Sequence, residues 1–292
     1  MNKTILLVWL TLLGFNTVVA QVAIGITNPS ESAILELAST EKGFLPPRLT
    51  TTQRDAIANP VEGLLIYNTN TKCLQIYNSQ FWISVCDGAA DVPTVIGANG
   101  VVWMDRNLGA SQVATSSTDE DSYGDLYQWG RAADGHEKRN SLTYSVVIST
   151  NGVPNFNASG NAWDGQFILR DNGDNNWVNP SLLGVDDLWQ GVNGTNNPCP
   201  TGYRVPTEAE WNAERQNWSS SNAAGAYASP LKLPLVGNRL HESGSILSSD
   251  FGDYWTSTVS GTKAQKFIIN SSVAGMDTNN RAFGFSVRCL KD

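Results

Sequence analysis

CPTGYRVPTEAEW, residues 199–211, combines a cysteine, a tight Pro/Gly turn, an arginine and the start of a helix. Thr207 is a good N-cap residue, and Glu210 follows three positions later, which is the spacing of a capping box. Trp211 and Trp218 fall on one stripe of such a helix, where we expect them to face the core. The stretch predicts a helix of about ten residues that begins after Thr207 and has a structural role.

The four cysteines of the chain allow three pairings if all are oxidised. Residues 73–78 (CLQIYN) and 81–86 (FWISVC) have the pattern of two strands, and a two-residue turn between them places Cys73 opposite Cys86. This is a non-hydrogen-bonded position, where the Cα atoms of an antiparallel ladder are about 4.5 Å apart, within reach of a disulfide. We therefore expect a Cys73–Cys86 disulfide.

The same register decides which side chains of the hairpin share a face. Tyr77 lies opposite Trp82 on one face. The other face carries aliphatic residues: Leu74, Ile76, Ile83 and Val85. One face is expected to be core, and the aromatic face is open to either a cover or a ligand.

With Cys73 and Cys86 paired, Cys199 and Cys289 remain for each other. About 90 residues lie between them, so in the loop-closure model the bond stabilises the fold by about 4 kcal/mol. Residues 282–289 (AFGFSVRC) alternate in the manner of a half-buried strand, with Cys289 on the inward side. The bond is expected to tie the middle of the domain to its last strand.

Residues 1–20 have the pattern of a signal peptide, with one lysine, an apolar run and small residues up to Ala20. Cleavage after Ala20 would leave an exported chain that begins at Gln21, and no other run has the length of a membrane span. The net charge of −8 and the lack of a basic stripe disfavour nucleic acid as a partner. We expect a secreted or outer-surface protein.

Residues 21–87 are expected to form a small β-rich module, and residues 88–95 a linker. Within the module, the run LTTTQRDAI predicts a short helix capped by Thr51 or Thr52. The stretch GFLPPRLTTTQRDAIANPVEGLLIYNT, residues 43–69, resembles a module at the N-termini of many exported surface and fibre-like proteins of the Bacteroidota. This resemblance implies surface display rather than chemistry.

Residues 96–292 carry six motifs, in order, that together resemble the Fibrobacter succinogenes major paralogous domain: GVVWMDRNLGA, YGDLYQWGRAADGHE, CPTGYRVPTEAEW, LKLPLVG, YWTST and GFSVRC. That family is similar to the formylglycine-generating (sulfatase-modifying) branch of the C-type-lectin-like fold. The resemblance implies an α+β domain with little regular structure, long surface loops and a last strand that pairs near GVVWM.

The same resemblance argues against an enzyme. Enzymes of that branch carry a Cys-x-x-x-x-Cys pair in the last strand; Cys289 matches the second cysteine, and Gly284 stands in the place of the first. A glycine has no thiolate to bind a metal or attack a substrate, so this activity is not carried over. His136 and His241 each begin a His-Glu pair, but neither continues into the H-E-x-x-H zinc motif. We expect no catalytic residues, no metal site and no cofactor.

Two acidic runs offer oxygen ligands to calcium. The run that starts at Asp119 has Tyr123 and Gly130 at EF-hand positions five and twelve, so it is not an EF-hand. Asp171 and Asp174 lie close together in DNGDNNW and could contribute to an irregular site. A solvated acidic loop is the favoured interpretation of this second run, and calcium is not predicted.

The ten tryptophans raise the question of a sugar platform. Burial is the commoner fate of this residue, and four tryptophans inside the family motifs are expected in the core: Trp103, Trp129, Trp211 and Trp255. Four others lie among Asn, Gly and Asp and are better candidates for exposure: Trp163, Trp177, Trp189 and Trp218.

In lectin-like folds the ligand is generally met by loops that lead into the last strands. The resemblance therefore gives a candidate surface: Trp255, Ser257, Asn270, Asn279, Asn280, Arg281 and Phe283. The alternative is that these are ordinary solvated loop residues, with Phe283 in the core.

The leading hypothesis is an exported, disulfide-stapled binding or adhesion module whose partner is a surface protein or a glycan. Three alternatives remain open. They are an enzyme of unfamiliar type with a loop-assembled site, a receptor whose C-terminal loops are diversified by a retroelement, and a structural subunit of a fibre or cell coat.

Overall fold

The computed structural model describes residues 21–86, 90–145, 152–170, 176–247 and 250–292, and the chain divides into two compact units, Met1–Arg48 and Leu49–Asp292. The expected signal peptide, residues 1–20, and the acidic pair Asp171 and Asp174 lie outside the described residues. The boundary between the units falls within the expected module of residues 21–87.

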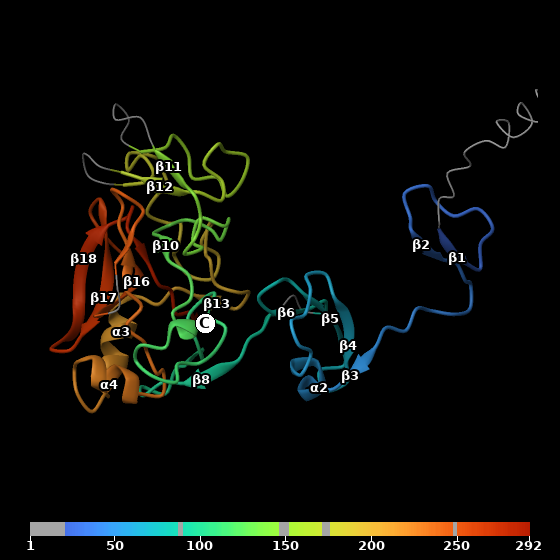
Figure 1. Ribbon diagram of the computed structural model, residues 1–292, viewed down its shortest axis with the longest axis horizontal. Helices are drawn as coiled ribbons and strands as arrows, with labels where there is room; N and C mark the ends of the chain where they lie inside the picture. Colours follow the sequence, from blue (N-terminus) through green and yellow to red (C-terminus); the bar gives the residue numbers. More distant parts are fainter. Residues whose placement is uncertain (1–20, 87–89, 146–151, 171–175, 248–249) are drawn as a thin grey trace, which may run out of the picture. The chain divides into compact units, whose positions relative to one another are not determined.

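The first unit contains a parallel pair of strands, β1 (Val22–Ile24) and β2 (Leu35–Leu37) (Figure 1). Val22 is paired with Leu35 and Ile24 with Leu37, so four apolar side chains share one face. All four are exposed, by 43% to 62%. Because a two-stranded pair is at best marginally stable alone in water, this face needs a cover.

A sheet of five strands in chain order follows: β3 (Arg48–Leu49), β4 (Leu65–Asn68), β5 (Cys73–Tyr77), β6 (Trp82–Ser84) and β7 (Ala90–Asp91). Helix α2 (Thr51–Asp55) lies between β3 and β4 in the chain. Its N-cap is Thr50, and not the expected Thr51 or Thr52, because Thr50 and Gln53 form a capping box with each other. The residues of β7 belong to the expected linker, but they pair with β6.

The hairpin of β5 and β6 has the predicted register. Tyr77 is paired with Trp82, and the two ring centroids are 5.4 Å apart. The predicted Cys73–Cys86 disulfide is present, with a Cα–Cα distance of 6.0 Å. This distance exceeds the roughly 4.5 Å of an ideal non-hydrogen-bonded pair but is usual for a disulfide.

The buried face of this sheet is the polar and aromatic one. Gln75 and Trp82 are buried, whereas Ile76 and Val85 are exposed by 40% and 56%. The interior is polar because Arg54 of α2 lies inside it, where it donates to Gln75 Oε1 at 2.8 Å and lies 5.8 Å from the centre of the Trp82 ring. The aromatic face is therefore covered, and the aliphatic face points to solvent.

The rest of the second unit has four small sheets among its described residues. In order of pairing, their strands are β13 (Tyr203–Arg204), β20 (Leu290–Lys291), β9 (Val102–Met104) and β8 (Thr94–Ile96); β10 (Tyr127–Gln128), β19 (Gly284–Phe285), β14 (Asn238–Arg239) and β15 (Ile246–Leu247); β11 (Thr143–Ser145) and β12 (Phe167–Leu169); and β16 (Phe251–Ser260), β17 (Lys263–Asn270) and β18 (Ala274–Asn280). The helices are η1 (Glu120–Ser122), α3 (Glu208–Arg215) and α4 (Ala223–Ala228). The described structure is thus a strand-rich, loop-rich α+β fold with few helices.

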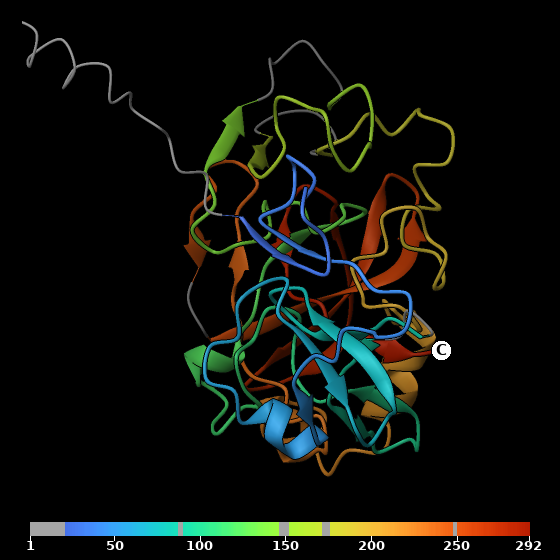
Figure 2. The same cartoon turned by 90° about the vertical axis from the view of Figure 1, so that its right-hand side faces the viewer.

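The end of the chain is fixed at two places. Leu290 of β20 is paired with Trp103 of β9, where the sequence motifs imply a pairing with GVVWM, and β20 also lies beside β13, which leads to α3 (Figure 2). The predicted Cys199–Cys289 disulfide is present, with a Cα–Cα distance of 5.9 Å. The expected strand over residues 282–289 is shorter than predicted, because only β19 forms part of a sheet there.

Helix α3 begins as the capping box predicts. Thr207 Oγ1 accepts from the Glu210 backbone N–H, and the Glu210 carboxylate accepts from the Thr207 N–H. The helix packs against β16, β17 and β18 (Figure 1). The ring of Trp211 is stacked on Phe267 with the centroids 4.9 Å apart. Trp218 is half-buried and meets the same phenylalanine edge-on.

The burial of the tryptophans differs in part from the prediction. The four expected in the core are fully buried, but Trp177 and Trp189 are buried too, at 2% and 0%, and Trp163 at 9%. Their expected exposure was wrong because polar neighbours in the sequence do not prevent burial of a ring whose N–H has a partner. Trp177 Nε1 donates to the Trp129 carbonyl and Trp189 Nε1 to that of Arg131.

Candidate functional site

The seven residues predicted as a binding surface do not form one exposed patch. Trp255, Ser257 and Arg281 are 0%, 1% and 1% exposed. The other four are half-buried: Asn270, Asn279, Asn280 and Phe283. Because a ligand cannot contact a fully buried side chain without opening the core, the first three are corrected to structural positions.

Arg281 is a buried side chain that connects separate parts of the chain. Its guanidinium lies 4.4 Å from the centre of the Trp129 ring, and Nη2 donates to Asp186 Oδ1 at 2.6 Å and to the Gly261 carbonyl at 3.1 Å. These partners come from three distant parts of the chain. The arginine therefore ties loops to the core instead of meeting a ligand.

The accessible asparagines lie at opposite ends of the β16–β17–β18 sheet. Asn279 and Asn280 belong to β18, an edge strand of that sheet, and are paired with Ala264 and Lys263 of β17. Asn270 closes the turn before β18, because its Oδ1 accepts from two following backbone N–H groups. Asn279 and Asn280 are the members best placed to contact a partner.

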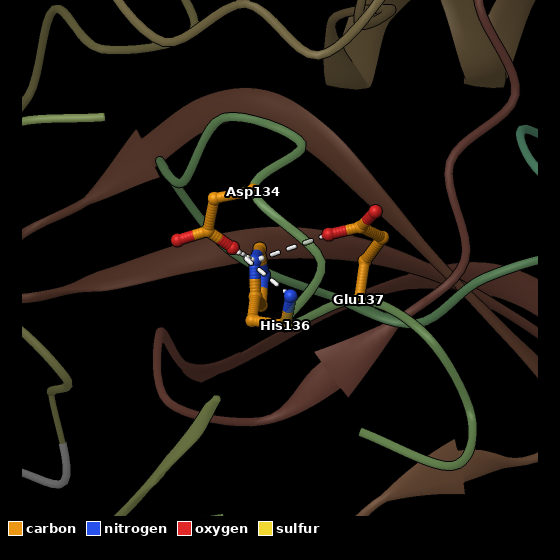
Figure 3. Close-up of side chains that lie close together, drawn as sticks. All are labelled: Asp134, His136 and Glu137. Carbon is orange, nitrogen blue, oxygen red and sulfur yellow. Dashed lines mark hydrogen bonds and ion pairs between the residues drawn. The ribbon is translucent and has the colours of Figure 1, made fainter. Parts of the chain in front are cut away.

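A second candidate is a compact group of side chains in the loop after β10: Asp134, His136 and Glu137 (Figure 3). Their potential ligand atoms all lie within 4.8 Å of one another. His136 Nδ1 is 2.6 Å from Asp134 Oδ1 and 3.4 Å from Glu137 Oε2. The imidazole points between the two carboxylates and is 0% exposed.

The surroundings keep this histidine neutral. Burial and the charge of Arg131 lower the pKa of His136 to about 3. Burial would raise the pKa of Asp134, but the hydrogen bond from His136 and the charge of Arg131 lower it to about 2. Burial also raises the pKa of Glu137. At neutral pH the centre of the group is an imidazole hydrogen-bonded to a carboxylate.

The hydrogen bonds of His136 leave no lone pair for a metal ion. The backbone N–H of Gln128 donates to Nε2 at 3.2 Å, so the proton of the neutral ring is on Nδ1 and is shared with Asp134. A metal would have to displace one of these partners, and a substrate could not reach the buried ring. The geometry therefore fits a structural clasp between this loop and β10 better than metal binding or catalysis.

The sequence contains a signal for this group that the search for H-E-x-x-H does not use. Asp134 stands two positions before His136, and an aspartate at that spacing can accept from the ring across a turn, as it does here. The same aspartate also pairs with Arg131 at 2.5 Å.

A third feature is the aliphatic face of the β4–β5–β6 sheet, which we call the outer face. Its six apolar side chains form two rows across the three strands: Leu65, Ile76 and Ile83, and Tyr67, Leu74 and Val85. Ile76 and Val85 are exposed, and the other four are half-buried. A contiguous apolar patch of this kind on a sheet marks an interaction surface. The alternation of the sequence placed four of these side chains on one face (Leu74, Ile76, Ile83 and Val85), but it did not predict that this face points outward.

Comparison with known families gives one match. The model of a phage tail-like trimerisation region matches residues 23–101, a segment that contains β2, all of β1 except Val22, and the outer face. No curated protein and no solved structure matches the chain. Every helix among the described residues is too short or too polar to cross a bilayer.

Proposed function

We propose that the protein is an exported surface protein that assembles into trimers through residues 23–101 and presents its C-terminal domain as a binding module for a protein or a glycan. One observation carries the proposal: the outer face, six apolar side chains on three strands that are all exposed or half-buried, lies within the segment that matches a trimerisation region.

The outer face has the properties of a contact between copies. Each aliphatic side chain moved from water into a contact contributes on the order of 1 kcal/mol, so the five aliphatic residues and Tyr67 of every copy together make a substantial driving force. The interior of the same sheet is partly polar, because Arg54 and Gln75 are hydrogen-bonded inside it beside the buried Ile66 and Trp82. A sheet built in this way gains stability when its outer face meets other copies.

The first unit needs a partner in the same way. The four exposed residues of its β1–β2 face, Val22, Leu35, Ile24 and Leu37, lie in or next to the matched segment. In a trimer, three such pairs would cover one another. Self-association thus accounts for both uncovered faces with one assembly.

The C-terminal domain is proposed to have the C-type-lectin-like fold of the Fibrobacter succinogenes major paralogous domain. Its loop-rich α+β structure and the position of β20 beside β9 support this fold. Gly284 in place of a catalytic cysteine favours binding over enzymatic activity. Asn279 and Asn280 would belong to the binding surface, and the two disulfides favour an oxidising location outside the cytoplasm.

The oligomeric state tests the first half of the proposal. Light scattering coupled to gel filtration of the mature protein should give the mass of three chains. Ile76→Lys and Val85→Lys place charges in the outer face and should reduce this mass to that of one chain. Thr71→Lys, which adds the same charge in the exposed turn before β5, should leave the trimer intact. A monomeric wild-type protein at micromolar concentration would contradict trimer assembly.

Ligand screening tests the second half. A glycan array and capture of surface proteins should both be tried with the trimer, because three linked copies bind with greater avidity than one. A structural fibre subunit is the second candidate, favoured by the match to a phage tail-like region. A trimer that binds nothing in either screen would support that candidate instead.

A further inference from the structure

A lysine, an aspartate and an asparagine are buried together where two sheets of the C-terminal domain meet. Asp253 of β16 accepts from Lys266 of β17 at 2.8 Å through Oδ1, and from Asn238 of β14 at 3.0 Å through Oδ2. The three residues are 1%, 5% and 7% exposed. One carboxylate thus holds an amine and a carboxamide, one on each oxygen.

Two features go beyond an ordinary buried ion pair. The Oδ1 atom of Asn238 is buried and has no hydrogen-bond partner among the described residues, which is costly for a carbonyl oxygen. The ring of Phe285 lies 4.9 Å from Lys266 Nζ and forms an apolar wall. Asp277 lies 3.8 Å from the same nitrogen but is 56% exposed, so it leaves one side of the group partly open to water.

Attack by the Lys266 nitrogen requires the loss of one ammonium proton, and Asp253, which accepts from Nζ at 2.8 Å, is placed to take it. The lysine amine is then a nucleophile, and the asparagine Cγ is the electrophile held by the same aspartate. The protonated Asp253 carboxyl faces Asn238 Nδ2 at 3.0 Å and is placed to pass the proton to that leaving nitrogen.

We infer that Lys266 and Asn238 become joined by an amide bond between Nζ and Cγ, with Asp253 as the acid and base. Asp253 takes one proton from the Lys266 ammonium, Nζ attacks Cγ, and a second proton leaves the same nitrogen. Both protons pass through Asp253 to Nδ2, the Cγ–Nδ2 bond breaks, and ammonium leaves. Asp253 ends as the carboxylate that it was at the start, and no oxidant or other reactant is needed.

The bond would cross between sheets that share no strand. Asn238 is in the β10–β19–β14–β15 sheet, and Lys266 is in the β16–β17–β18 sheet. Together with the Cys199–Cys289 disulfide, it would give the domain a second covalent tie that reducing agents do not break.

Peptide mapping of the reduced, mature protein tests the inference. Trypsin should not cut after an acylated Lys266, and a branched peptide should contain both Asn238 and Lys266 at the summed mass less one ammonia. The mass of the intact chain alone is ambiguous, because a Gln21 at the N-terminus can also cyclise with loss of ammonia. The peptide map separates the two reactions.

Two variants serve as controls. Asn238→Ala removes the acceptor but keeps the Lys266–Asp253 pair, and Asp253→Asn removes the acid and base. Both should yield a free Lys266 that trypsin recognises, while a Cys199–Cys289 linked peptide in a parallel digest without reducing agent shows that the domain has folded. Separate linear peptides from the wild-type protein, cut after Lys266, would overturn the inference. A branch from Lys266 to Asp253, with loss of water, would overturn the assignment of Asn238 as the acceptor.

Discussion

Arg204 and Glu210 are joined by two hydrogen bonds across the start of α3, of 2.8 Å from Nη1 to Oε2 and 2.6 Å from Nη2 to Oε1. The same carboxylate accepts from the backbone N–H of Thr207 at 2.8 Å. One side chain therefore caps the helix and holds the arginine of the CPTGYR turn.

Replacement of Glu210 by alanine should lower the free energy of unfolding by about 1 to 2 kcal/mol, because the cap and the arginine pairing are lost together. Burial would raise the pKa of Glu210, but the hydrogen bonds from Arg204 and Thr207 lower it below 4.5. Its contribution should therefore be present above pH 4.5 and decrease as the pH falls below that value. Urea unfolding at several pH values measures both effects. Glu208→Ala, in the same turn, is the matched control and should change stability less.

The features that the sequence predicted well are those set by near neighbours. The capping box of Thr207 and Glu210 depends on a spacing of three, and the alignment of Cys73 with Cys86 depends on the turn between two adjacent strands. Local spacing is sufficient in both cases because the interacting groups are brought together by one turn of chain.

The pH dependence of stability should depend on His136. Its pKa is lower in the folded protein than in the unfolded chain, so the unfolded state binds more protons as the pH falls. The free energy of unfolding should be greatest above pH 6.5 and should decrease by about 1.4 kcal/mol per pH unit between pH 6.5 and pH 3. Chemical denaturation over that range provides the measurement.

His136→Gln is the control for this slope. It removes the titrating ring, so the variant should be less stable at pH 7 but should have a flatter profile between pH 6.5 and pH 4. If the wild-type protein and the variant show equal slopes, other groups cause the acid sensitivity.

The features that the sequence did not predict depend on distant partners. Arg281 lies in a polar loop pattern, but Trp129 and Asp186, which hold it, are far away in the chain. The alternation of the hairpin separates an aliphatic from an aromatic face, but it does not determine which face is buried. Arg54, from the helix before the hairpin, bonds to Gln75 and so covers the aromatic face. Periodicity describes one element at a time, whereas burial is settled between elements.

Asn279 and Arg281 should respond differently to substitution. The double change Asn279→Ala and Asn280→Ala should reduce binding to a surface partner by at least about tenfold, and should change stability by less than about 0.5 kcal/mol, because both side chains are half-buried on an edge strand. Arg281→Ala should instead destabilise the domain by roughly 1 to 3 kcal/mol, since it removes a buried side chain that packs on Trp129 and pairs with Asp186. Thermal unfolding and a binding assay on the same samples separate the two. A double variant that unfolds would show that the asparagines are structural.

Removal of the Cys199–Cys289 disulfide should lower the free energy of unfolding more than removal of Cys73–Cys86. Its sequence separation is 90 residues, against 13 for Cys73–Cys86. In the loop-closure model the longer loop corresponds to about 4 to 5 kcal/mol and the shorter one to about 3 kcal/mol. The double variant Cys199→Ala and Cys289→Ala should therefore lose more stability in urea than Cys73→Ala with Cys86→Ala. An equal loss would show that the tie between the CPTGYR turn and the end of the chain is maintained by other contacts, of which the Leu290–Trp103 pairing is the first to examine.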